Sequence, residues 1–154
     1  MIICREKSLK KEVKYRLIKH ISFLKNELED YETFVNLTYE EYDQERNKRR
    51  NVERWVENIV NSSIDIARII LVSEGLNLPD TYKELINSLS CIPNFNDVNS
   101  KKLSGWVKLR NIMVHEYLDI RWSSIKEFIS ESKPLYENFL KSVKKYLELR
   151  TDKK

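Results

Sequence analysis

Apolar residues recur at helical spacing along most of this sequence, and that periodicity constrains the fold more than any other feature. Over about residues 7–47, large apolar side chains follow one another at steps of three or four: Val13, Leu17, Ile21, Leu24, Leu28, Tyr31 and Val35. Steps that average about 3.6 residues align these side chains on one face of a helix. We expect one long helix here, with the polar stretch from 40 to 51 forming its exposed end, a turn, or both.

A second helix is expected over about 51–74, with two apolar rows that let it pack on two sides. The first row is Val52, Val56, Ile59, Ser63, Ile66 and Ile70, and the second is Trp55, Ile69 and Val72. Gly75 predicts a left-handed stop for this helix, with Leu76 folded back over its last turn.

Shorter helices are expected further along the chain. Thr81 and Glu84 have the spacing of a capping box, which predicts a helix over about 81–90. The stretch 91–99 is rich in turn-forming residues and predicts a loop. A fourth helix is expected from about 97 into the 115 region.

The last helix is expected to open at Ser123 or Ser124, with Glu127 completing a capping box. Pro134 lies inside its apolar pattern. Because proline has no N–H to donate and its ring clashes with the preceding turn, we expect a kink or a split there.

Composition agrees with helices throughout. Only two glycines and three prolines in 154 residues leave little material for the turns of a many-stranded sheet. Charged residues at 34% beside hydrophobic residues at 41% suit amphipathic helices around a shared core. We predict an all-α fold, an up-and-down bundle of four to five helices, as a single domain over residues 1–154.

The cellular setting is also predicted from composition. The longest aliphatic run, residues 69–72, is too short to span a bilayer, and the start of the chain has no apolar stretch typical of a signal peptide. Two cysteines, Cys4 and Cys91, do not by themselves make a disulfide framework or a zinc site. We expect a cytoplasmic protein with no membrane contact and no metal or cofactor of its own.

The net charge of +4 is modest, but lysines and arginines gather at the N-terminus, at 46–54 and in the C-terminal tail. Since 24 acidic residues are interleaved with them, each cluster is either a solvated helix face or part of a surface that follows RNA phosphates. Charge alone leaves both open.

The segment 109–117 concentrates the residues able to do chemistry. Arg110 is followed directly by Asn111, and His115, one of only two histidines, lies two residues before Tyr117. At about 100° per residue, Asn111 and His115 share one helix face, Arg110 and Tyr117 share an adjacent one, and His115 lies about 140° around from Arg110. Both can reach one phosphate if the helix distorts between them, or if two copies pack so that their motifs line one cleft.

The order Arg110-Asn111-x3-His115-x-Tyr117 resembles the R-x4-H-x-Y motif of the HepT-like branch of HEPN domains, the toxin halves of HEPN/MNT toxin–antitoxin pairs. Segments 53–67 and 78–84 stand where that family places similar segments, so the resemblance covers about residues 50–150. The chain departs from the family at Gly105, because related sequences tend to put a glycine closer to the arginine. The resemblance implies a HEPN-type bundle that forms a homodimer with a composite site.

The implied activity is that of a metal-independent endoribonuclease. RNA carries its own nucleophile, the ribose 2′-hydroxyl, so cleavage needs only a proton-transfer group and a countercharge. His115 suits the first role and Arg110 the second, with Asn111 orienting either the histidine or a phosphate oxygen. The expected products carry a 2′,3′-cyclic phosphate and a 5′-hydroxyl.

The resemblance also implies a partner. In similar toxins the motif tyrosine, here Tyr117, is the target of an MNT antitoxin, a nucleotidyltransferase that transfers AMP from ATP to the hydroxyl. The added bulk and negative charge beside Arg110 and His115 would exclude RNA. The ATP and Mg²⁺ would belong to the partner.

Each residue also has a structural explanation. Arg110 can pair with a carboxylate, for which Asp65 on the second helix is the supporting candidate; His115, Asn111 and Tyr117 can be ordinary helix-end, interface and packing residues. Trp106 and Trp122, which bracket the motif, either stack on a base or bury at an interface.

Two other functions remain open: a non-catalytic partner module that binds a nucleotidyltransferase and its nucleotide or substrate, and a bundle that binds RNA without cutting it.

Overall fold

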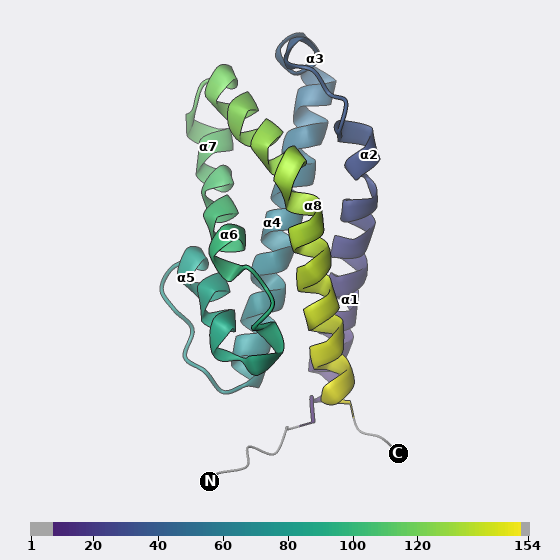
Figure 1. Ribbon diagram of the computed structural model, residues 1–154, viewed down its shortest axis with the longest axis vertical. Helices are drawn as coiled ribbons and strands as arrows, with labels where there is room; N and C mark the ends of the chain where they lie inside the picture. Colours follow the sequence, from purple (N-terminus) through teal and green to yellow (C-terminus); the bar gives the residue numbers. More distant parts are fainter. Residues whose placement is uncertain (1–7, 152–154) are drawn as a thin grey trace.

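The computed structural model describes residues 8–151, and every regular element in this range is helical. Three long helices run side by side (Figure 1). They are α1 (Lys11–Glu29), α4 (Arg46–Ser73) and α8 (Leu118–Leu149). The fourth position of the bundle is filled by short elements placed end to end along α4. These are α6 (Ser100–Gly105), the 3-10 turn η3 (Trp106–Lys108) and α7 (Leu109–His115).

The chain direction alternates between neighbours, so the predicted up-and-down all-α bundle is confirmed. The start of α1 and the end of α8 meet at one end of the bundle, and the corner between α7 and α8 lies at the other end (Figure 1). Within residues 8–151, no helix has both the length and the hydropathy that crossing a membrane requires. Cys4, the start of the chain and part of both terminal basic clusters lie outside the described residues.

One hydrophobic core lies between the helices, and the periodicity of the sequence predicts most of it. From α1, the core takes Leu17, Ile21, Leu24 and Leu28. The whole first row of α4 is buried, and so are Trp55 and Ile69 of its second row, whereas Val72 is exposed. The Trp55 indole donates its N–H to the carbonyl oxygen of Glu27 at 2.6 Å, which joins α4 to α1.

The single helix expected over residues 7–47 is wrong. After α1 the chain makes the one-turn helix α2 (Tyr31–Phe34) and then α3 (Tyr39–Gln44). A capping box starts α3: the Thr38 hydroxyl accepts the backbone N–H of Glu41, and the Glu41 carboxylate accepts the backbone N–H of Thr38, both at 3.2 Å. This local pairing favours the start of a new helix after Thr38, and Val35, expected on the buried stripe, is exposed.

Two predicted helix boundaries are confirmed. Gly75, with a φ of +71°, follows the end of α4; its N–H bonds to the carbonyl of Val72, and the Leu76 N–H bonds to that of Leu71. This pair of bonds is the Schellman arrangement, which satisfies carbonyls that the helix end leaves open. The Thr81 hydroxyl accepts the backbone N–H of Glu84 and starts α5 (Tyr82–Asn87). This helix ends earlier than expected, because the 3-10 turn η1 (Ser88–Cys91) replaces its last turn, and the 3-10 turn η2 (Pro93–Phe95) lies in the expected loop.

The expected start of the last helix at Ser123 or Ser124 is wrong. Glu116 and Tyr117 are extended, with ψ values of 160° and 161°, and α8 begins directly after them at Leu118. Pro134 lies on an exposed position inside α8, which continues through it, so the helix is not split there.

Candidate active site

The structure places most of the motif on α7, a short and regular helix. Arg110 and His115 both belong to it, and the irregular turn η3 precedes Arg110 rather than separating the two residues. Within the described residues, the helix therefore does not distort in the way that would bring both side chains of one chain to one phosphate. Tyr117 lies beyond the end of α7 in extended backbone, so the expected sharing of a helix face with Arg110 is wrong.

A hollow of about 460 Å³ lies beside Arg110, between α4, α5 and α7. Its lining joins residues that are far apart in the sequence: Glu57, Asn61, Tyr82, Val107, Arg110, Asn111 and Val114. His115 is not among them. Within one chain, Arg110 and Asn111 therefore line this hollow, whereas His115 lies outside it.

The Arg110 side chain is half-buried, and its contact is aromatic rather than ionic. Its guanidinium carbon lies over the ring of Tyr82, 4.8 Å from the ring centroid. Tyr82 is the first residue of α5, and its side chain is 44% exposed. A second arginine, Arg68 of α4, lies 5.8 Å from the same centroid.

Asp65 does not pair with Arg110. Its carboxylate lies 3.4 Å from the guanidinium of Arg68, three residues further along α4, and both side chains of this ion pair are solvent-exposed. Asp65 also lines a separate hollow between α1 and α4, together with His20 and Asn61. The expected support of Arg110 by Asp65 is therefore replaced by the Tyr82 ring.

Three motif side chains stand free in the described part of the chain. Asn111, His115 and Tyr117 are exposed and make no side-chain hydrogen bond or ion pair with residues 8–151. Tyr117 is 82% exposed, the highest value among the described large hydrophobic side chains. A tyrosine in such a position does not pack against its own chain, so the packing explanation for Tyr117 is wrong within one copy.

The two tryptophans that bracket the motif belong to the packing of the bundle. Trp106 is buried and stacks on Tyr136 with ring centroids 5.6 Å apart. Trp122 is partly buried and lies 5.3 Å from the ring of Tyr42. Because Trp106 is buried, its ring is not open to an RNA base, whereas Trp122 keeps part of its surface exposed beside Tyr39 and Tyr42.

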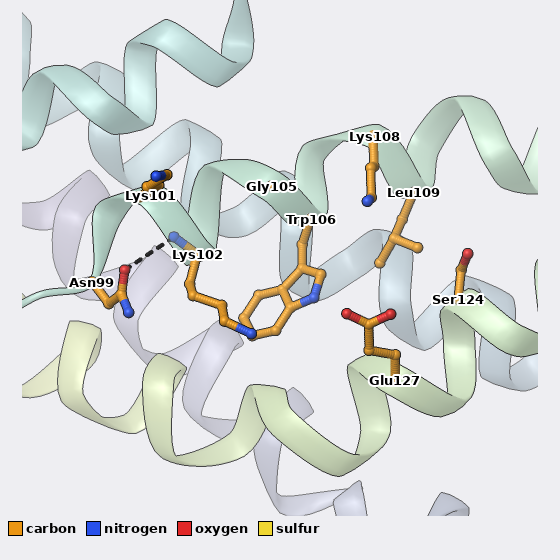
Figure 2. A pocket seen from close by; sticks show the side chains of 9 residues that line it. All are labelled: Asn99, Lys101, Lys102, Gly105, Trp106, Lys108, Leu109, Ser124 and Glu127. Carbon is orange, nitrogen blue, oxygen red and sulfur yellow. Dashed lines mark hydrogen bonds between the residues drawn. The ribbon is translucent and has the colours of Figure 1, made fainter.

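A second hollow, of about 360 Å³, lies where α6, η3 and the start of α7 face α8 (Figure 2). Trp106 and Lys102 point toward α8, from which Ser124 and Glu127 point back. Lys102 is held by an ion pair with Glu131 at 2.7 Å. Because this hollow contains no motif residue and its central side chains already have partners, we assign it to the packing of α6 against α8.

The basic cluster at 46–54 is partly structural. Lys48 forms ion pairs with Glu41 and Glu45. Arg49 donates to the backbone carbonyl oxygens of Tyr42 and Asp43, at 3.1 and 2.8 Å, and so satisfies acceptors at the end of α3. These contacts join α3 to α4, and RNA binding by the cluster stays a prediction.

Sequence reasoning missed Tyr82, Glu57 and Asn61 as neighbours of the motif. Tyr82 lies within segment 78–84, and Glu57 and Asn61 lie within segment 53–67, and both segments contribute to the family resemblance. No spacing rule relates residue 82 to residue 110, because their proximity depends on how α5 packs beside α4 and α6.

The structure thus places the R-x4-H-x-Y motif of this helical bundle at the corner between α7 and α8. The family model for HepT-like ribonucleases matches residues 24–143, and the chain belongs to that family.

A solved structure with a similar fold is that of the tri-AMPylated Shewanella oneidensis HEPN toxin in complex with its MNT antitoxin. The TM-score is 0.64 at 19% sequence identity, over 86% of this chain and 94% of that chain. At this identity the likeness concerns the fold. No curated protein matches the sequence.

Proposed function

We propose that this protein is the toxin of a HEPN/MNT toxin–antitoxin pair and that it cuts RNA without a metal ion. The observation that carries the proposal is the free R-x4-H-x-Y motif, with Arg110 at a hollow and His115 and Tyr117 open to solvent. The family description as a ribonuclease supports the activity, and the fold shared with a toxin in complex with an antitoxin supports the setting.

The cleavage step uses groups that the motif supplies. The ribose 2′-oxygen attacks the adjacent phosphorus and loses its proton, while the bond from phosphorus to the 5′-oxygen breaks and that oxygen gains a proton. His115 is the proton-transfer group. Arg110 binds the phosphate and offsets the negative charge that grows on its oxygens, and Asn111 orients the imidazole or a phosphate oxygen.

We propose a homodimer with a composite site. On one chain Arg110 faces the hollow while His115 lies outside it, and α7 is regular between them. Two copies related by a two-fold axis place the same surface of each against the other, so the histidine of one copy is able to approach the arginine of its partner. The exposed apolar side chains Val114 and Ile120, which flank His115 and Tyr117, support burial of this corner between copies.

The direct test is cleavage of RNA by purified wild-type protein in EDTA, with the product ends identified. We expect fragments that carry 2′,3′-cyclic phosphate and 5′-hydroxyl ends. Protein that is dimeric and free of AMP yet cuts no RNA would contradict the nuclease proposal, and would favour a partner module that binds a nucleotidyltransferase. Cleavage that requires added Mg²⁺ would contradict metal independence.

We further propose that Tyr117 is the residue that the antitoxin modifies, because its hydroxyl is accessible and its ring follows the motif histidine closely. Incubation with the antitoxin, ATP and Mg²⁺ is expected to add AMP to wild-type protein and to stop cleavage, and to do neither to the Tyr117→Phe variant. Intact mass and RNA cleavage measure the two effects.

Tyr15→Phe is the matched control, since Tyr15 is also exposed, at 59%, but lies on α1. This variant is expected to gain AMP and lose activity as the wild type does. Equal AMP incorporation into Tyr117→Phe would place the modification on another residue.

A further inference from the structure

Tyr82 lies outside the motif and makes a cation–π contact with Arg110, whose guanidinium carbon is 4.8 Å from the centroid of the ring. It is held from two directions, since Thr81 caps the helix that begins at Tyr82, and that helix packs against both α4 and α6. Its ring lines the hollow beside Arg110. The contact between Tyr82 and Arg110 therefore joins α5 to α7.

The chemistry of this contact suits a group that must bind phosphate. A flexible arginine loses side-chain entropy when it is fixed in one orientation, so prior ordering favours binding. A carboxylate partner would order Arg110 but occupy the N–H donors that phosphate needs. An aromatic face interacts with the charge of the guanidinium and brings no competing acceptor.

The Arg110 guanidinium contacts an aromatic ring while its N–H donors have no partner among residues 8–151. Arg110 makes no hydrogen bond or ion pair with the described residues, and its side chain is half-buried against the ring. Arg68, which shares the ring at the greater distance of 5.8 Å, is by contrast paired with Asp65. Of the two arginines at Tyr82, Arg110 is the one whose donors are free.

We propose that Tyr82 is a positioning residue: its ring orients Arg110 so that the guanidinium N–H groups are free to bind the RNA phosphate at the site of cleavage. This inference rests on the proposed nuclease function. The aromatic ring of Tyr82 orients Arg110, and the Tyr82 hydroxyl is not needed for this role.

The test compares Tyr82→Leu, which removes the ring, with Tyr82→Phe, which keeps it. A surface cation–π contact of about 0.5–1 kcal/mol corresponds to about a two- to fivefold change in rate. We expect the kcat for RNA cleavage to fall by about that factor in Tyr82→Leu and to match wild type in Tyr82→Phe. Equal rates in the leucine and wild-type proteins would overturn the inference, and so would an equal loss in the leucine and phenylalanine variants.

Tyr15→Leu is the matched control. Tyr15 is an exposed tyrosine with a cation, Lys19, 4.7 Å from its ring centroid, but it lies on α1 away from the motif. Loss of a similar surface contact there is expected to leave kcat unchanged. A loss equal to that of Tyr82→Leu would show that the effect is not specific to Arg110.

Two readouts separate positioning from a general structural effect. In an Arg110→Gln background, Tyr82→Leu is expected to cause no further loss, because the group that it positions is gone; an additive loss would overturn the proposal. The NMR signal of the Arg110 Nε–H group reports the ring without any RNA. We expect it to be shifted by the ring in wild type and in Tyr82→Phe, and to move in Tyr82→Leu.

The NMR measurement also distinguishes this inference from the proposed function. Wild-type protein that cuts no RNA but shows the ring-shifted signal would contradict the nuclease proposal while the Arg110–Tyr82 contact stands. Wild-type protein that cuts RNA with no difference between the two Tyr82 variants would overturn the positioning role alone.

Discussion

Replacement of His115 by alanine is expected to lower RNA cleavage by about 10²- to 10⁴-fold, the range over which a positioned acid–base group contributes. The imidazole is exposed and has no partner within residues 8–151, so its removal leaves no buried group unsatisfied. We therefore expect the stability of the variant to stay within about 0.5 kcal/mol of wild type.

The measurement is a cleavage time course in EDTA, accompanied by thermal unfolding. His20→Ala is the matched control, because His20 is the other histidine of the chain and lies on α1 in a different hollow. This control is expected to cut RNA at the wild-type rate. Full activity in His115→Ala would remove the histidine from the mechanism or reveal a contaminating nuclease, and loss of activity in both variants would point to a folding defect.

A second large effect is expected from combining two impaired chains. Arg110→Gln and His115→Ala should each retain only a small residual activity as homodimers. In a heterodimer of the two, one composite site has both mutated positions and the other has an intact arginine from one chain and an intact histidine from its partner. Such a heterodimer is expected to recover about half of the wild-type activity per dimer, because one of two symmetric sites is complete.

The experiment requires co-expression of the two variants with different affinity tags and purification through both tags. A heterodimer made from His20→Ala and wild-type chains, prepared in the same way, controls for the tags and is expected to be fully active. Recovery of activity would establish that the two groups come from different chains. No recovery in a heterodimer of confirmed composition would show that one chain supplies both, and would contradict the composite site.

The long helices of the bundle were predictable because their cores are built from repeated local spacing. The buried stripe of α1 and both rows of α4, apart from the exposed Val72, follow from apolar residues at every third or fourth position. The stop at Gly75 was predictable for a related reason. A left-handed residue after a helix is favourable for glycine and costly for most others.

The breaks between helices were harder to predict, since several local signals compete. Thr38 and Glu41 have the same capping spacing as Thr81 and Glu84, yet they lie in a stretch whose apolar steps also suit a continuous helix. Ser123 and Glu127 likewise suggest a start that α8 does not use. In both cases the choice depends on tertiary packing, which adds burial to one of two alternatives of similar local energy.

The sequence by itself determined the fold class, the family and the motif, because helical periodicity and a fixed order of Arg110, Asn111, His115 and Tyr117 are properties of nearby residues. The tertiary structure decided what surrounds Arg110. In the folded chain the Tyr82 ring of α5 contacts the Arg110 guanidinium, Asp65 pairs with Arg68, and His115 lies outside the hollow. These outcomes depend on how helices far apart in the sequence pack together, and spacing along one helix carries no information about that packing.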